Sequence, residues 1–323
     1  MEAILAHEGA VLSYETVADP EPKPGEALVE LKAAAVNRRD LLVRRGVYPF
    51  PLPLVPGSDG AGIRRDTGEE VVILPSLNWG PNEAAAGADF EILGGPRNGT
   101  YAELVAVPAE NLFPKPAGLS WEEAAAFPLA ALTAYRALFA VGRLSDRETV
   151  LVLGAGSGVS TFAVQLTAQV GARVLVTSSS QEKIDRSVEL GAEGGFLYTE
   201  GDWAEEARAA TGGRGVELVI DSVGSTWPES LRAVARGGRV VVFGGTGGTE
   251  ATLQVRPFYL QWLSLLGTTM GSPNDFAALL RLLSSAVWKP VLDSVRPLSE
   301  AGAAHDRLES EADKFGKLVL ICH

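Results

Sequence analysis

The sequence contains few of the residues that build disulfide bonds and zinc sites. Among its 323 residues are one cysteine, Cys322, and three histidines, His7, His305 and His323. A single cysteine excludes an internal disulfide, and this set cannot form the usual cysteine and histidine zinc site unless carboxylates supply further ligands. No motif surrounds His7, His305 or Cys322, so we interpret them as structural or surface residues.

Positive charge is also scarce. The 28 lysine and arginine residues are outnumbered by 40 aspartate and glutamate residues, which gives a net charge of −12. Nucleic-acid binding and attachment to a membrane surface through basic residues both need clustered positive charge. We therefore expect neither kind of partner.

The sequence lacks the pattern of a secretory signal or a membrane span. Its start, MEAILAHEGA, has no basic region and no long apolar core. The longest uncharged stretch, Thr149–Ala172, is long enough to cross a bilayer, but it holds four glycines and several serine, threonine and glutamine residues. We interpret it as a buried strand, a turn and a helix, and we expect a cytoplasmic protein.

The composition is that of a globular protein, with 46% hydrophobic and 21% charged residues. At about 100–200 residues per domain, the length indicates two domains, and the pattern changes near residue 147. Before about residue 116, short β segments alternate with connections rich in proline and glycine, which predicts a compact, mostly β domain. The expected strands are Ala27–Ala35, Glu70–Leu74 and Tyr101–Val107.

The pattern predicts a helix from residue 120 and, from Thr149 onward, buried strands and helices in alternation. Ser120 is a candidate N-cap, with Glu123 at capping-box spacing, for a helix over Ser120–Ala140. The apolar runs VLVL, RVLVT, GFLYT, VELVID and RVVVFG are separated by helix-length segments, which predicts a doubly wound parallel α/β sheet. The later expected elements are a strand over Leu263–Met270, a helix over Asn274–Ser285, a strand near Val291–Val295, a helix near Ser299–Glu309 and a strand over Lys317–Cys322.

A glycine-rich turn follows the first of these strands, in VLVLGAGSGVSTFAVQL. Backbone N–H groups at the start of the next helix could bind a pyrophosphate. The match to G-x-G-x-x-G is imperfect, since Val159 follows Gly154 and Gly156, and the shifted alignment gives Ala155, Ser157 and Ser160. A plain tight turn is the alternative interpretation.

The end of the second strand bears on the choice of cofactor. NAD enzymes place an acidic residue there to bind the ribose hydroxyls, whereas this chain has three serines followed by Lys183. Hydroxyl and ammonium groups suit a 2′-phosphate, so the pattern favours NADP(H) over NAD(H). The alternative is that Lys183 is only a solvated helix residue.

Eight motifs, taken together and in order, resemble the medium-chain dehydrogenase/reductase superfamily, in its zinc-free quinone oxidoreductase-like branch. They are VNRRDLLVRRGVYP at 36–49, VPGSDGAG at 55–62, LTAYRAL at 132–138, GAGSGVSTFAVQ at 154–165, ELGA at 189–192, VIDSVG at 219–224, RVVVFG at 239–244 and FGKLVL at 315–320. The resemblance covers essentially the whole chain. It implies a GroES-like catalytic domain over residues 1–118, a Rossmann NADP(H)-binding domain over 119–265 and a C-terminal segment over 266–323 that returns to the first domain.

The resemblance also implies that both zinc sites of the family are missing. Asn37 stands where the zinc branch has a cysteine, and Ser58 stands where it has a histidine. The segment Leu77–Asn98 matches the lobe that elsewhere carries four cysteines, and it has none.

The resemblance further implies a set of cofactor contacts. They are Thr133 for the nicotinamide; Ser157, Gly158 and Val159 for the phosphates; Ser179, Lys183 and Tyr198 for the 2′-phosphate; Val223, Gly244, Gly245 and Thr246 in the loops after the fourth and fifth strands; Thr269 and Met270 after the sixth; and Lys317 near the C-terminus. Ser160 departs from the usual final glycine of the turn.

A reductase without a metal needs an acceptor that is already electron-poor. We therefore expect transfer of a hydride from NADPH to a quinone carbonyl or to an α,β-unsaturated carbonyl compound, with Asn37 and Tyr48 as hydrogen-bond donors to the developing oxyanion. The alternatives are that Asn37 only caps a turn and that Tyr48 only packs against prolines. Asp40 is expected to organise this loop and to pair with a neighbouring arginine. The candidates are Arg38, Arg39, Arg44 and Arg45, which could instead meet an anionic substrate such as a CoA ester.

Three other functions remain open: an enoyl-CoA (acrylyl-CoA-like) reductase, a zinc alcohol dehydrogenase and a non-catalytic NADPH-binding protein. The apolar run Leu263–Leu266 is expected at a sheet edge, which proteins usually cover or pair. Because the resembled family pairs there, we expect a homodimer.

Overall fold

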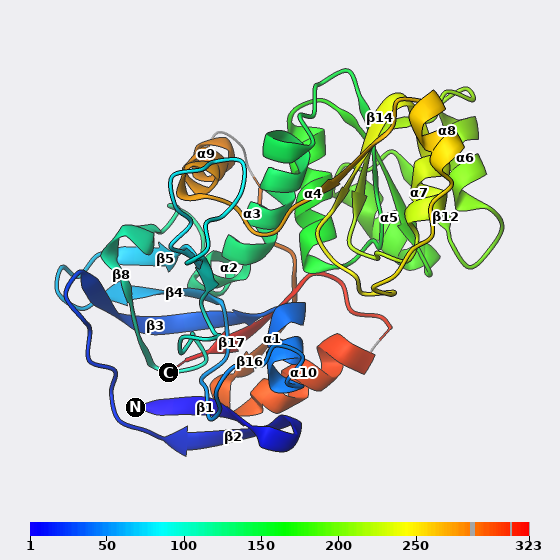
Figure 1. Cartoon of the computed structure of the whole chain (residues 1–323). Coiled ribbons are helices and arrows are strands. Elements are labelled where there is room, and N and C mark those ends of the chain that lie inside the picture. The colour runs from blue at the N-terminus through cyan, green and yellow to red at the C-terminus, as the bar shows by residue number, and fades with distance from the viewer. Residues whose placement is uncertain (285–287, 311, 323) are drawn as a thin grey trace. The chain divides into compact units, whose positions relative to one another are not determined.

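The computed structural model of the chain describes residues 1–284, 288–310 and 312–322. It divides into two compact units, of which the first comprises Met1–Leu132 with Gly271–His323 and the second comprises Thr133–Met270 (Figure 1). The first unit is therefore built from two stretches of chain, with the second unit inserted between them.

The first unit contains a sheet in the order β16-β17-β3-β4-β5-β9, and β8 also pairs with β3. Its strands are β3 (Glu26–Val36), β4 (Asp59–Arg64), β5 (Glu70–Ile73), β8 (Leu104–Pro108), β9 (Leu112–Pro114), β16 (Leu292–Pro297) and β17 (Lys317–Ile321). The red strand β17 runs antiparallel to the blue strand β3, with Leu318 opposite Val36. Residues from both ends of the sequence thus form one sheet.

Helices and smaller pairs of strands surround this sheet. They are the hairpin of β1 (Glu2–His7) and β2 (Val11–Thr16), the pair β6 (Ser76–Leu77) and β7 (Glu91–Ile92), and the helices α1 (Arg38–Arg44), α2 (Trp121–Ala126), α9 (Pro273–Ser284) and α10 (Ala301–Ser310). The core of the unit includes Leu31, Leu41, Tyr101, Leu318 and Leu320, each no more than 2% exposed. It therefore joins strands, α1 and the C-terminal stretch in one apolar cluster.

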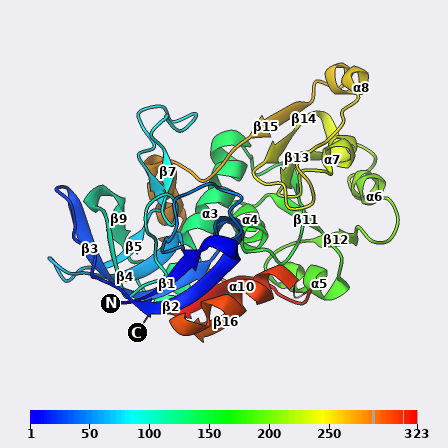
Figure 2. The same cartoon turned by 60° about the horizontal axis from the view of Figure 1, so that its bottom comes forward.

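The second unit is a six-stranded parallel sheet in the order β12-β11-β10-β13-β14-β15. In chain order of its strands this is 3-2-1-4-5-6, the doubly wound dinucleotide-binding arrangement, which confirms the predicted fold class. The strands are β10 (Thr149–Val152), β11 (Arg173–Ser178), β12 (Gly194–Leu197), β13 (Val216–Asp221), β14 (Val234–Val242) and β15 (Ser264–Gly267), and the helices are α4 (Gly158–Gln169), α5 (Gln181–Glu189), α6 (Trp203–Ala210), α7 (Trp227–Ala233) and α8 (Val255–Leu260). Figure 2 shows β15 as the edge strand of this sheet, entered from α8.

Two expected elements differ in extent. The helix expected over residues 120–140 is divided into α2, α3 (Pro128–Tyr135) and a π-helical segment, Arg136–Val141. Pro128 explains the break between α2 and α3, because proline donates no backbone hydrogen bond. The capping box of Ser120 and Glu123 is confirmed. The sixth strand is shorter than expected, and Met270 has φ 51°, a left-handed backbone that a strand cannot contain.

The boundaries of the compact units also fall later than the expected ones after residues 118 and 265. Helix α2 packs against β3 and β4, so it belongs to the first unit. The expected helix over Asn274–Ser285 is α9, and its expected last residue lies outside the described residues, as does His323.

The stretch Thr149–Ala172 forms β10, a turn and α4, as the sequence predicts. Among the described residues, no helix is long and apolar enough to cross a membrane. The cytoplasmic location stays a prediction.

Candidate functional site

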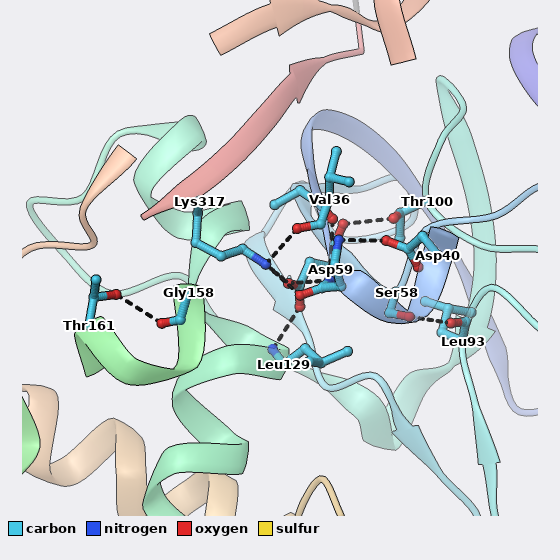
Figure 3. Close-up of polar contacts among 12 residues, drawn as sticks. Val36, Asp40, Ser58, Asp59, Leu93, Thr100, Leu129, Gly158, Thr161 and Lys317 are labelled. Atoms are coloured by element: carbon cyan, nitrogen blue, oxygen red, sulfur yellow. Dashed lines mark hydrogen bonds and ion pairs between the residues drawn. The ribbon is translucent and has the colours of Figure 1, made fainter. Parts of the chain in front are cut away.

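A buried lysine is the centre of a polar cluster in the first unit (Figure 3). Lys317, at the start of β17, is 3% exposed. Its ammonium group donates to Asn37 Oδ1 at 2.5 Å, to Val36 O at 3.1 Å and to Asp59 Oδ2 at 3.1 Å. A buried ammonium needs such partners, because removal of a charge from water is costly. These three oxygens therefore use all three hydrogens of the ammonium group.

Asp59 supplies the negative charge of this cluster. It begins β4 and is fully buried. Its Oδ1 accepts from the backbone N–H of Leu129 at 2.7 Å, and its Oδ2 accepts from Asn37 Nδ2 at 2.9 Å as well as from Lys317. Hydrogen bonds thus surround both carboxylate oxygens.

Asn37 connects this pair to α1. Its side-chain oxygen accepts from Lys317, and its Nδ2 donates to Asp59 and, over 3.4 Å, to Ala35 O. Both amide hydrogens therefore have partners within the chain, and the side chain is largely buried. To act as the predicted donor to a substrate, Asn37 would have to break the 3.4 Å hydrogen bond from its Nδ2 to Ala35 O. Its catalytic role stays a prediction.

Asp40 fixes the start of α1. Its Oδ2 accepts from the backbone N–H of Asn37 at 2.8 Å and from the hydroxyl of Tyr101 at 3.0 Å. Burial raises the pKa of the Asp40 carboxyl to about 6, although the Asn37 N–H and the charge of Arg39 oppose the rise. The hydrogen bond from the backbone N–H of Asn37 to Asp40 confirms that Asp40 organises this loop.

The expected pairing of Asp40 with a neighbouring arginine takes the form of a charge interaction with Arg39, which lowers the pKa of the carboxyl. The guanidinium of Arg39 donates to Gly95 O at 2.6 Å and to Gly94 O at 3.4 Å. It lies 5.5 Å from the ring centre of Tyr48 and 5.7 Å from that of Phe50. Arg39 acts on Asp40 only through its charge.

Tyr48, the second predicted donor, is 39% exposed and stacks on Phe50, with 5.8 Å between the ring centres. The structure therefore gives Tyr48 an aromatic packing partner, Phe50. Its role as a donor stays a prediction.

The sequence analysis did not identify Tyr101 as a candidate site residue, and it interpreted His305 as a structural or surface residue. His305 is fully buried, and its Nε2 lies 3.3 Å from the hydroxyl of Tyr101. Burial and the charge of Arg44 lower the pKa of His305 to about 3, so the ring is neutral. Asp59 was also missed, although it adjoins Ser58 in the motif VPGSDGAG.

The first unit does not fit a zinc ion at the family positions. Ser58 is buried and donates to Leu93 O at 2.8 Å, so its hydroxyl is committed. The ammonium of Lys317 already provides a cation for the oxygens of Val36, Asn37 and Asp59. Within residues 1–284, 288–310 and 312–322, no group of three or more His, Cys, Asp and Glu residues could hold a metal ion.

The glycine-rich turn of the second unit has the geometry of a phosphate site. Gly154 and Gly156 have φ of 74° and 92°, in the region that favours glycine. Ser157 caps α4 by accepting from the N–H of Ser160 at 3.1 Å. Gly158 and Val159 open this 12-residue helix, whose first N–H groups suit an anion. The hydroxyl of Ser160 folds back onto Ser157 O at 2.9 Å, so a small side chain serves in place of the usual glycine.

The predicted 2′-phosphate residues gather at the ends of β11 and β12. The backbone N–H of Tyr198 donates to Ser178 O at 3.0 Å, which brings the residue after β12 to the end of β11. Ser179 is exposed there, Lys183 lies in the first turn of α5, and Tyr198 is 49% exposed. No carboxylate ends β11, as the sequence indicates.

The loops after β13 and β14 are held together by their backbones. Thr246 N donates to Ser222 O at 3.1 Å, and Gly247 N donates to Val223 O at 2.9 Å. A Cβ on Gly224, which has φ 85°, would lie 2.4 Å from the carbonyl oxygen of Gly248. Only glycine permits this approach.

These loops include four of the predicted cofactor residues, Val223, Gly244, Gly245 and Thr246. Gly244 and Gly245 line a pocket of about 910 Å³ beside Gly224 and Trp227. Ligands of this fold bind at such carboxyl ends of strands. Sequence reasoning missed the buried carboxylate that holds the loop after β13: Asp221 accepts from the N–H groups of Val223 and Gly224.

The remaining predicted cofactor residues are Thr133, Thr269, Met270 and Lys317. Thr133 is 5% exposed on α3, and Met270 is 3% exposed after β15, next to Thr269. The ammonium of Lys317 belongs to the cluster of the first unit. The contacts of these residues with a cofactor stay predictions.

Two protein-family models match the chain. The alcohol dehydrogenase GroES-like domain matches residues 23–117, and the zinc-binding dehydrogenase domain matches residues 158–285. The first match confirms the predicted GroES-like class, and the second corresponds to most of the parallel-sheet unit.

Known proteins are similar over nearly the whole length. The zinc-type alcohol dehydrogenase-like protein of Schizosaccharomyces pombe is 37% identical over 316 residues, covering 92% of this chain and 91% of that protein. The quinone oxidoreductase of Rattus norvegicus is 29% identical, covering 94% and 91%. The crystal structure of an NAD-dependent alcohol dehydrogenase is 40% identical, with a TM-score of 0.94 and complete coverage of both chains.

Proposed function

This chain belongs to the medium-chain dehydrogenase/reductase superfamily, and on that premise we propose that it is a zinc-independent, NADPH-dependent reductase of quinones or other α,β-unsaturated carbonyl compounds. The superfamily match supports an oxidoreductase. The observation that carries the finer proposal is the ammonium of Lys317 among the oxygens of Val36, Asn37 and Asp59.

The donor set of the first unit supports this class of acceptor. An amide and a hydroxyl at the family's zinc positions are poor zinc ligands compared with thiolate and imidazole. Without a Lewis acid, an acceptor must itself stabilise the added electrons, as quinones and enones do. An unactivated alcohol would gain no such assistance from this site.

The residues of the second unit fit a dinucleotide with a 2′-phosphate. When bound, NADPH supplies the hydride. The turn from Gly154 to Ser157 offers backbone N–H groups and the start of α4 to a pyrophosphate. Lys183 supplies positive charge near the end of β11, where an NAD enzyme would have a carboxylate.

A zinc-dependent alcohol dehydrogenase is the competing function, because one relative is called zinc-type and one similar structure is that of an NAD-dependent alcohol dehydrogenase. It predicts zinc near one equivalent per chain, loss of activity with a chelator and oxidation of alcohols with NAD. Our proposal predicts the opposite result in each measurement.

The test is oxidation of NADPH, followed by absorbance, with a panel of quinones, enones and enoyl-CoA esters. NADH is run in parallel, and a chelator is present throughout. Turnover with NADPH that resists the chelator and exceeds turnover with NADH supports the proposal. The fastest acceptor then distinguishes a quinone or enone reductase from an enoyl-CoA reductase. Tight NADPH binding without turnover of any acceptor would instead favour a non-catalytic NADPH-binding protein.

We also propose that the chain forms a homodimer through the outer edge of β15. This strand ends the sheet, and Val255, Tyr259 and Trp262 beside it are each more than half exposed. Arg236 lies 4.1 Å from the ring centre of Trp262. Light scattering at micromolar concentration tests this proposal, and a monomeric mass would contradict it.

A further inference from the structure

Three buried polar side chains connect distant parts of the first unit. Asp40 lies on α1, Tyr101 precedes β8, and His305 lies on α10. The Tyr101 hydroxyl is 3.0 Å from Asp40 Oδ2 and 3.3 Å from His305 Nε2, and all three residues are fully buried. The hydroxyl is thus shared between a carboxyl group and an imidazole.

Ion pairs add to the attachment of α10 to α1. Arg44 lies 3.2 Å from Asp306, and Arg45 pairs with Glu309. Arg44 also donates to Ala10 O at 2.7 Å. Helix α1 is therefore held on its inner side by the buried group and at its surface by two salt bridges.

The buried group is a costly way to fill a core. Within the part of the chain that the structure describes, Asp40 Oδ1 and His305 Nδ1 have no hydrogen-bond partner. Each such atom destabilises the fold relative to one that has a hydrogen-bond partner. Apolar side chains of similar size would pack here at lower cost. The arrangement therefore calls for a role other than stability.

We propose that Tyr101 and His305 are positioning residues for the reaction. They keep Asp40 Oδ2 in its hydrogen bond with the backbone N–H of Asn37. This contact keeps the side-chain amide of Asn37 in place, where its oxygen accepts from the Lys317 ammonium. The kinetic part of this inference rests on the proposed function, whereas its structural part does not.

The geometry supports positioning and not a proton relay. The series of hydrogen bonds runs from His305 through Tyr101 to Asp40 and ends at a backbone N–H. A backbone amide does not release its proton under these conditions, and Asp40 itself is buried. The group can orient Asn37, but it offers a substrate no acid or base.

The surroundings of the group give it a dependence on pH. Asp40 is faced by Arg39, Lys317 and Tyr101. His305 is faced by Arg44 and Asp306, and Tyr101 also by Asp59 and Cys322. Burial raises the pKa of Asp40, and the Tyr101 hydroxyl lowers it. Removal of that hydroxyl should therefore raise the pKa of Asp40 further.

The kinetic test compares Tyr101→Phe with Tyr14→Phe, a matched control at a half-exposed tyrosine of β2. Because a misplacement of about 1 Å can cost about a hundredfold in rate, a smaller displacement in Tyr101→Phe should lower kcat by about tenfold while KM for NADPH stays unchanged. The acid limb of the pH profile should move to higher pH. In Asp40→Asn, which keeps an acceptor oxygen but cannot ionise, that limb should disappear. Unchanged kcat and pH profile in Tyr101→Phe would overturn the proposal.

The structural test needs no acceptor. Hydrogen exchange of the peptide that contains Asn37 is measured by mass spectrometry on the full chain. Faster exchange in Tyr101→Phe and His305→Phe, but not in Tyr14→Phe, supports the proposal. Unchanged exchange overturns it, even if no acceptor is turned over and the proposed function fails. Faster exchange with wild-type kcat also overturns it, since the positioning would then have no effect on the reaction.

Discussion

The first unit gathers charged and polar side chains in its interior, whereas the second presents backbone groups and small side chains at the ends of its strands. Lys317, Asp59 and Asn37 satisfy one another away from water. In the second unit, the turn at Gly154–Ser157 and the loops at Val223 and Gly244 depend on glycine backbones. Removal of one partner should therefore damage the first unit more than the second.

The largest expected effect is that of Lys317→Met. Loss of the ammonium leaves Asp59 buried without a cation, and breaking a buried pair in this way costs about 3–5 kcal/mol. Urea denaturation of the full chain measures the change in the free energy of unfolding. Lys32→Met is the matched control, because the half-buried pair of Lys32 with Glu30 should contribute only about 0–1 kcal/mol. An equal loss of unfolding free energy in both variants would contradict the expected difference between the buried pair and the half-buried pair.

The second prediction concerns acid and His305. The unfolded chain takes up a proton near pH 6.5, whereas the folded pKa of His305 is about 3. Stability from His305 is therefore present above pH 6.5 and is lost as the pH falls toward 3. Asp40 has the opposite sign: its folded pKa of about 6 exceeds the ordinary 3.8, so its contribution is present below 3.8 and is lost as the pH rises through 6.

Each pKa unit corresponds to about 1.4 kcal/mol, so the loss at His305 amounts to a few kcal/mol. His305→Phe should flatten the acid side of a plot of unfolding free energy against pH. His7→Phe, at a partly exposed ring, should not. A wild-type slope in His305→Phe would show that other groups cause acid sensitivity.

The third prediction concerns the loop after β13. Gly224→Ala places a Cβ 2.4 Å from Gly248 O on a residue with φ 85°, so the two loops must separate. We expect dinucleotide affinity to fall about tenfold, from strain of about 1–3 kcal/mol. Gly194→Ala, in the same unit and with open space around the new Cβ, is the control. Calorimetric titration with NADPH measures both.

The fourth prediction discriminates between cofactors, and its expected effect on NADPH binding is similar in size to that of Gly224→Ala. Lys183→Ala should weaken NADPH binding about tenfold, by loss of a charge-assisted contact of about 1.5–3 kcal/mol, and should leave NADH binding unchanged. The same titration with both cofactors supplies the internal control, and Gln181→Ala in the same helix supplies a second. Equal weakening of both cofactors would show that Lys183 does not recognise the 2′-phosphate.

The second unit could be predicted from sequence because its signals are local. The strand before Gly154, the turn and the cap at Ser157 lie within a few residues of one another. The absence of a carboxylate after β11 was equally visible. Such features depend on backbone conformation and on neighbouring residues, which a single sequence displays.

The interior of the first unit could not be predicted in the same way. Tyr101 and His305 are 204 positions apart, and Lys317 and Asp59 are 258 apart. Pairings over such distances arise from the fold and not from a local pattern. The hairpin β1–β2 was missed for a different reason: its turn places Ala10 at φ 63°, a conformation that alanine does not signal.

The pairing of β17 with β3 has a consequence for the order of events during synthesis. Domains generally fold as units as the chain emerges from the ribosome. The second unit, Thr133–Met270, is complete before residue 317 has been added, whereas β3 has β4 and β8 as partners but lacks β17 until then. A nascent chain can thus acquire its dinucleotide-binding sheet while Asn37 and Asp59 still lack their cation. Molecules released early by a stalled ribosome would have the parallel sheet without the buried cluster around Lys317.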